Sequence, residues 1–147
     1  MSNRYYAYIL ISDNKWWRRL YERGRSSNKP QVFVRRNRVG PLNTQRLLFY
    51  VKKPIMQIQG VAEFIERLVG DYTELWDTHS DETCLKNFDE YVDFLKGRKI
   101  ATFIRFKDLH ELKSPISMAM MRKVLGVGKM PRGGKYLNRE MANQLIV

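Results

Sequence analysis

Hydrophobic positions in this chain come in short runs separated by polar turns, and the first run is apolar at every position. "YYAYILI" (5–11) leaves no alternate positions for solvent, so it predicts a strand that is buried on both faces. The next segment, "DNKWWRRLYERG" (13–24), predicts a helix that is capped by Asp13 and ended by Gly24. Its apolar residues share one helical stripe: Trp16, Trp17, Leu20 and Tyr21.

Three further strands are predicted close together, at 31–36, 45–51 and 56–69. The third also fits a helical period, but Gly60 after the alternating Met56 and Ile58 favours a bulged strand. The links between these strands are too short to hold crossover helices. The pattern therefore argues against a doubly wound nucleotide-binding fold.

The second half of the chain alternates between helical and extended patterns. It predicts a helical turn at 72–76, a strand at 99–106, and helices at 81–98, 114–126 and 138–146. The helix at 81–98 has the clearest apolar stripe: Leu85, Phe88, Val92 and Leu95. This order of elements predicts an α+β fold, in which about five or six mixed strands curl into a barrel with surrounding helices.

Size and composition fit one compact domain over residues 1–147, since 44% of the 147 residues are apolar. The single cysteine, Cys84, cannot form an internal disulfide. With His79 and His110 it offers too few ligands for a structural zinc site, so we expect no metal and no cofactor. The chain has no uncharged apolar run of about 18 residues and no cleavable leader, which predicts a cytoplasmic protein without a membrane partner.

Positive charge gathers towards both ends of the chain. There are 27 lysines and arginines against 15 acidic residues. Residues 15–38 hold nine basic side chains and residues 113–135 hold six, whereas residues 63–93 hold ten acidic ones. If the fold brings the two basic segments together and turns the acidic segment away, the basic surface attracts polyanions. The alternative is that these charges only form surface ion pairs.

The segment "GKMPRGGKY" (128–136) combines glycines with basic residues, as phosphate-binding loops do. It is not a P-loop, because Gly134 stands where that motif needs lysine, and Tyr136 follows Lys135 where it needs serine or threonine. Its glycines let the backbone approach a partner, and its other side chains suit nucleic-acid contacts: Lys129, Arg132, Lys135 and Tyr136. A flexible basic connector is the alternative.

Further candidate cations lie around the second and third predicted strands: Arg35, Arg36, Arg38, Lys52 and Lys53. Arg35 and Arg36 point to opposite faces of a strand, so only one of them can face outward over a core. Arg105 interrupts an apolar strand and faces either solvent or a polar cavity. The candidates for base stacking are the three tryptophans: Trp16, Trp17 and Trp76. Core packing is the alternative use, and we favour it for Trp16 and Trp17.

Two stretches resemble the PUA-like superfamily, especially its ASCH and EVE groups. They are "LLFYVKKPIMQIQGVAEFIERLVGDYTELW" (47–76) and "FIRFKDLHELKSPISM" (103–118), the latter followed by "GGKYL" (133–137). The resemblance spans residues 5–146 and implies a pseudobarrel with a role in nucleic-acid binding. In some members it implies a pocket where aromatic rings stack a modified or flipped-out base. Some ASCH relatives hydrolyse amides or RNA with a lysine and carboxylates.

The sequence therefore predicts a domain that binds nucleic acid, with RNA favoured over DNA, through a basic face and an aromatic-lined cleft. A non-enzymatic role is favoured, and no catalytic residue is assigned. Two alternatives stay open. One is a small hydrolase that acts on RNA or a modified nucleoside, and the other is a subunit that docks its basic ends on an acidic protein.

Overall fold

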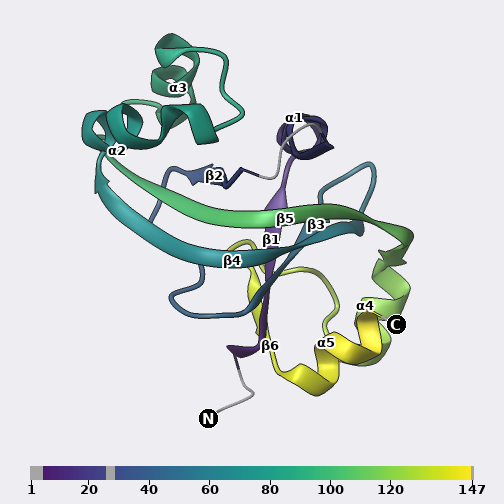
Figure 1. Cartoon of the computed structure of the whole chain (residues 1–147). Helices are drawn as coiled ribbons and strands as arrows, with labels where there is room; N and C mark the ends of the chain where they lie inside the picture. The colour runs from purple at the N-terminus through teal and green to yellow at the C-terminus, as the bar shows by residue number, and fades with distance from the viewer. Residues whose placement is uncertain (1–4, 26–28, 147) are drawn as a thin grey trace.

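The computed structural model describes residues 5–25 and 29–146, and its elements alternate along the chain (Figure 1). The strands are β1 (Ala7–Ser12), β2 (Gln31–Arg35), β3 (Arg46–Val51), β4 (Gln57–Asp71), β5 (Ile100–Ser117) and β6 (Lys135–Leu137). The α-helices are α1 (Asn14–Arg25), α2 (Tyr72–His79), α3 (Phe88–Leu95), α4 (Met118–Leu125) and α5 (Arg139–Leu145). A short 3₁₀ helix, η2 (Ser80–Glu82), follows α2.

The strands of the described residues form a six-stranded mixed sheet in the order β2-β5-β4-β3-β1-β6. β1 runs parallel to β3, and the other neighbouring pairs are antiparallel. Figure 1 shows β4 and β5 as long, curved strands that pass across β1, so the sheet is strongly coiled. The predicted α+β class, with five or six mixed strands in a curled sheet, is confirmed.

The central strands are buried on both faces because each face meets its own core cluster. In β1, Ala7 and Ile9 join one cluster, and Tyr8 and Leu10 join another. β3 divides its residues in the same alternating way. The continuous apolar runs of the sequence are thus explained, since alternate side chains of a strand point to opposite faces.

Helix α1 covers the second of these clusters through Trp17 and Leu20. Its approach depends on Gly60, because a Cβ atom at that position would lie 2.3 Å from the Trp17 ring and 2.8 Å from the carbonyl oxygen of His110. The pairing of β4 with both neighbours shifts register next to Gly60, so the predicted bulge is confirmed. The helix runs one residue past the predicted end at Gly24.

The predicted helix at 81–98 is wrong over its first half. Thr83 forms a parallel bridge with Val32, and the helix begins only after Asn87, whose side chain accepts a hydrogen bond from the Glu90 amide. Its phase differs too. Tyr91 and Leu95 are buried, whereas Phe88 and Val92 are 39% and 36% exposed. α2 and α3 cover a third cluster, which includes Val32 and Phe103 from the sheet.

The predicted start of the helix at 114–126 is also wrong, because β5 continues to Ser117. There Ile116 pairs with Ile58 of β4, and Ser117 pairs with Gln57. β2 pairs with β5 only as far as Phe106, so Pro115 lies where β5 has no neighbour on that side. A proline is tolerated in an edge segment of this kind, because no partner strand needs its missing N–H group.

Helices α4 and α5 cover the remaining sheet face, opposite α1, through Met118, Met121, Ala142 and Leu145. Met118 and Met121 are therefore buried, whereas Met120 is 42% exposed. In the part of the chain that the structure describes, no helix has the length and hydrophobicity needed to cross a bilayer.

Candidate functional site

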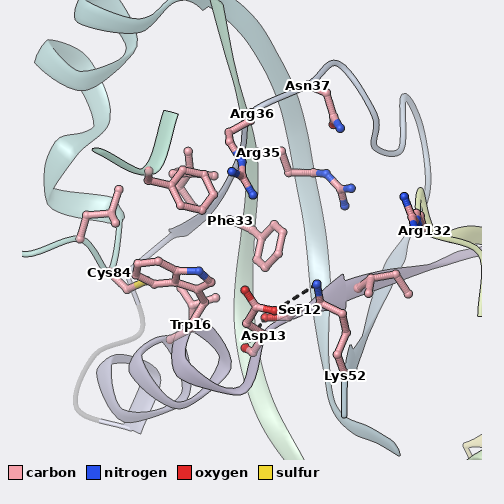
Figure 2. Close-up of a pocket in the computed structure, with 16 residues that line it drawn as sticks. Ser12, Asp13, Trp16, Phe33, Arg35, Arg36, Asn37, Lys52, Cys84 and Arg132 are labelled. Atoms are coloured by element: carbon pink, nitrogen blue, oxygen red, sulfur yellow. Dashed lines mark hydrogen bonds and ion pairs between the residues drawn. The ribbon is translucent and has the colours of Figure 1, made fainter. Parts of the chain in front are cut away.

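A cleft of about 160 Å³ opens where the end of β1, helix α1, strand β2 and the η2–α3 link meet (Figure 2). Its basic residues come from three separate segments: Arg35, Arg36, Lys52 and Arg132. Its aromatic residues are Trp16, Phe33 and Phe94. Five residues proposed from the sequence for binding or stacking thus meet here: Arg35, Arg36, Lys52, Arg132 and Trp16.

Arg35 is the most constrained cation of the cleft. It is the last residue of β2, and its Nη1 atom is buried without a hydrogen-bond partner among the described residues. Burial lowers the pKa of Arg35, although a guanidinium remains charged at neutral pH. Figure 2 shows its side chain extending towards Arg132. Arg35 is therefore a desolvated charge that an anion in the cleft would compensate.

Arg132 reaches the cleft because the glycine-rich segment lies directly against β1. The Tyr8 hydroxyl donates a hydrogen bond to the Gly133 carbonyl, and β6 continues the contact by pairing with β1. Gly134 has a φ of +90°, and a Cβ atom there would lie 2.3 Å from the Ile9 carbonyl oxygen. The segment is therefore held in place, and the predicted close backbone approach of its glycines is made to β1.

Lys52 lies at the mouth of the cleft, in the turn that follows β3. Its backbone amide donates to the Ser12 carbonyl over 2.9 Å, and its ammonium group lies 3.1 Å from the Asp13 carboxylate. Both side chains are more than half exposed, which limits the strength of this ion pair. Lys52 can therefore exchange Asp13 for an anionic ligand at low cost.

The aromatic side of the cleft already holds cations against its rings. Trp16 meets Phe94 edge to face at 5.5 Å, and the Lys15 ammonium group lies 4.7 Å from the centre of the Trp16 ring. The Arg19 and Arg36 guanidinium groups lie 5.0 and 5.2 Å from the Trp16 and Phe94 rings, respectively. A base that stacks on Trp16 would displace Lys15 rather than Arg19, because Arg19 is held by an ion pair with another side chain.

Arg19 fastens the η2–α3 link, which forms one wall of the cleft. Its guanidinium group donates to both carboxylate oxygens of Glu90 over 2.6 and 3.1 Å. This pairing, chiefly through its hydrogen bond, lowers the pKa of Glu90 to about 2. Cys84 lies on the same wall, and burial raises the pKa of its thiol to about 11. The thiol therefore stays protonated at neutral pH and is a poor nucleophile.

Replacing Glu90 by glutamine is expected to lower the free energy of unfolding by about 1 to 2 kcal/mol at pH 7, with salt screening of this partly exposed pair taken into account. Because the folded pKa is depressed, the stabilisation is present above the usual carboxyl pKa and is lost as the pH falls towards about 2. Urea unfolding of both proteins, repeated as the pH is lowered from 7 towards about 2, measures this loss of stabilisation. Asp93→Asn on the same helix is the control, and an equal loss there would contradict the role of the Arg19 pair.

Several proposed residues lie outside the cleft lining. Arg38, Lys53 and Lys129 are exposed, and Lys135 lies on β6. The Tyr136 ring packs against Tyr8, and its hydroxyl accepts a hydrogen bond from the Leu42 amide. The geometry gives no preference to any of these residues as a ligand contact.

Two tryptophans are used for packing. Trp17 is only 4% exposed and lies against Phe49, as the favoured alternative predicts. Trp76 stacks on Tyr91 in the third cluster, with ring centroids 4.7 Å apart. Trp17 is too deeply buried to stack a base, and Trp76 lies outside the cleft lining. We therefore leave both out of the candidate site.

Arg105 is neutralised by two carboxylates. Its guanidinium group donates to Glu66 over 2.6 Å and to both oxygens of Glu82 over 2.8 Å. The hydrogen bonds that Arg105 donates to Glu82 and Glu66 raise the pKa of Arg105 further. Of the two environments considered from sequence, the partly buried polar one is correct, but acidic partners already occupy it. Arg105 secures η2 to the sheet and adds no free charge to the cleft.

The predicted meeting of the two basic segments is confirmed at the cleft, where Arg35 and Arg36 lie together with Arg132. The acidic segment is not turned away, however. Its η2–α3 part forms a wall of the cleft through Cys84, Leu85 and Phe94, and its carboxylates pair with Arg19 and Arg105. Part of the positive charge is therefore neutralised within the fold.

Sequence reasoning did not single out four polar or aromatic residues that line the cleft: Asp13, Phe33, Asn37 and Phe94. Phe33 alternates with Val32 and Val34 on β2, and such a residue looks like ordinary core. Phe94 is separated from α1 by a long stretch of chain. Asp13 lies next to a helix, and Asn37 lies next to a basic cluster. These positions were the one signal that could have drawn attention to them.

No family model matches the chain, and no curated protein matches its sequence. Among solved structures, the ASCH protein of Zymomonas mobilis is similar with a TM-score of 0.76 at 19% identity, over 98% of this chain and 94% of that one. Two mutant forms of that protein give TM-scores of 0.76 and 0.77 at 20% identity, over 99% and 95% of this chain and 97% and 96% of theirs. The chain thus has the fold of this ASCH protein, as the resemblance predicts.

Proposed function

We propose that this protein binds RNA through the cleft. The observation that carries the proposal is the convergence of four cations from separate segments, one of them the buried Arg35 guanidinium without a partner among the described residues. Guanidinium groups recognise phosphate oxygens through paired hydrogen bonds. A cleft that holds both cations and aromatic rings suits the two parts of a nucleotide. The ASCH-like fold supports this reading as an analogy.

RNA is favoured over duplex DNA because of the size and shape of the site. The cleft, at about 160 Å³, has room for single groups and not for a double helix. Proteins that read RNA mostly take unpaired nucleotides, whose bases are free to enter pockets. A single strand or a loop is therefore the expected ligand.

The salt dependence of binding tests the proposal. The logarithm of the affinity for a short single-stranded RNA is expected to fall linearly with log salt, with a slope of at most about 3, the value for four phosphate contacts. Arg36→Gln removes a cation of the cleft and is expected to reduce that slope by about 0.7. Arg38→Gln removes an exposed arginine two residues away, outside the lining, and is the matched control. An identical effect of both variants would contradict the assignment of the cleft.

Hydrolysis is a second candidate function, and the Lys52–Asp13 pair at 3.1 Å favours it. A lysine with a carboxylate partner at the mouth of a cleft can act on a bound nucleic acid or nucleoside. Loss of labelled RNA on incubation, abolished by Lys52→Gln but not by Lys53→Gln, would support it. Intact RNA after incubation with the wild-type protein would remove it.

A further inference from the structure

The cleft carries more positive charge than an internal phosphate of RNA can balance. Its four cations face one carboxylate among the lining residues, Asp13, and that group already pairs with Lys52. The guanidinium groups of Arg35, Arg36 and Arg132 have no carboxylate partner in residues 5–25 and 29–146. An internal phosphodiester brings one negative charge, whereas a phosphate monoester brings about 1.5 to 2.

Arg35 and Arg132 define the place where such a charge would lie. In Figure 2 the two guanidinium ends face the same space from opposite sides, with Asn37 next to them. The buried Nη1 donor of Arg35 lacks a partner among the described residues, which is unfavourable until an acceptor arrives. An anion with several free oxygens satisfies both groups at once, since each guanidinium can bind two oxygens.

Trp16 and the pair of Arg35 and Arg132 occupy different ends of the cleft. Figure 2 shows Trp16 and Cys84 at one end, Arg35 and Arg132 at the other, and Phe33 between them. The volume of about 160 Å³ corresponds to about a dozen water positions. This space suits the base and the phosphate group of one nucleotide, with the base towards Trp16 and the phosphate towards Arg35.

We propose, on the basis of the RNA-binding function above, that the cleft takes the phosphorylated end of an RNA chain. The ligand is a terminal nucleotide with a phosphate monoester, which lies between Arg35 and Arg132. An internal nucleotide is disfavoured because its diester leaves part of the positive charge uncompensated. A free nucleoside monophosphate has the same chemistry, so the experiment must separate the two sources.

The experiment uses one short single-stranded RNA in three forms: with a 5′-phosphate, with a 3′-phosphate, and with hydroxyl groups at both ends. A dye in the middle of the chain reports binding by fluorescence anisotropy at constant salt. One phosphorylated form is expected to bind at least about tenfold more tightly than the unphosphorylated form near pH 8. The preference should shrink near pH 5, because the second pKa of a phosphate monoester is about 6.

Competition by adenosine monophosphate and by adenosine separates recognition of the monoester from recognition of the chain. The monophosphate is expected to displace the phosphorylated RNA, whereas adenosine is not. A monophosphate that competes as tightly as the RNA binds would assign the site to free nucleotides and overturn the proposal for RNA ends.

Variants complete the test. Arg35→Gln and the exposed Arg132→Gln are each expected to abolish the preference for a phosphorylated end. Arg132→Gln keeps the test decisive if Arg35→Gln does not fold. Arg98→Gln, an exposed change outside the lining, should keep the preference. Equal affinity for all three RNAs overturns the proposal while RNA binding stands. Failure of every RNA to bind overturns RNA binding as well.

Discussion

Replacing Arg35, Arg36 and Arg132 together by glutamine is expected to weaken the binding of single-stranded RNA at least about a hundredfold at low salt. Each hydrogen bond to a charged group contributes about 1.5 to 3 kcal/mol, so three lost contacts exceed the roughly 2.8 kcal/mol that a hundredfold change requires. Glutamine keeps polar bulk in the cleft. Isothermal titration calorimetry measures the loss directly.

The matched control for this variant removes the same amount of charge elsewhere. Arg98, Lys99 and Lys123 are exposed and lie outside the cleft lining, so their triple replacement by glutamine lowers the net charge equally. It is expected to weaken binding only a few fold, through the general field of the protein. If both triple variants lost affinity to the same extent, general attraction would explain the binding and the cleft would not.

Gly134→Ala is the change expected to have the largest effect on stability, about 3 kcal/mol or more. A residue with a side chain at φ +90° is strained by about 1 to 3 kcal/mol, and the new methyl group would overlap the Ile9 carbonyl oxygen, which belongs to the central strand and cannot move aside. The melting temperature should fall by about 10 °C, as scanning calorimetry would show. RNA affinity should fall with it, since this segment positions Arg132.

Gly128→Ala in the same segment provides the comparison. A Cβ atom at Gly128 meets no atom within 4 Å, so the change is expected to alter the free energy of unfolding by less than about 0.5 kcal/mol. Similar losses at both positions would mean that the segment tolerates no side chain anywhere. The specific contact with β1 would then not be the cause.

The elements that were predicted correctly have local signals. The continuous apolar run of β1 and the glycine after Ile58 each act within a few residues, so periodicity is enough to find a buried strand and a bulge. The boundary of α3 depends instead on the bridge between Thr83 and Val32, residues far apart in the chain. No helical period within 81–98 can report such a contact.

The candidate site was partly predictable for the same reason. Basic residues near both ends of the chain indicated a shared positive surface, and Arg36 and Arg132 do meet. Their meeting depends on β6, whose three residues are too short for any pattern to identify as a strand. The neutralisation of Arg105 depends on Glu82, which η2 brings to the sheet from another part of the chain. Charge counts along a sequence cannot show which cations the fold compensates.

The position of β1 between β3 and β6 has a consequence for synthesis on the ribosome. β1 emerges early, but its second neighbour and Arg132 emerge only after residue 131 has been translated. Until then one edge of β1 exposes unpaired backbone groups, and the cleft lacks one of its cations. A nascent chain therefore completes the cleft only after residue 132 has been made, and a truncated product that stops before that residue lacks one of the four cations.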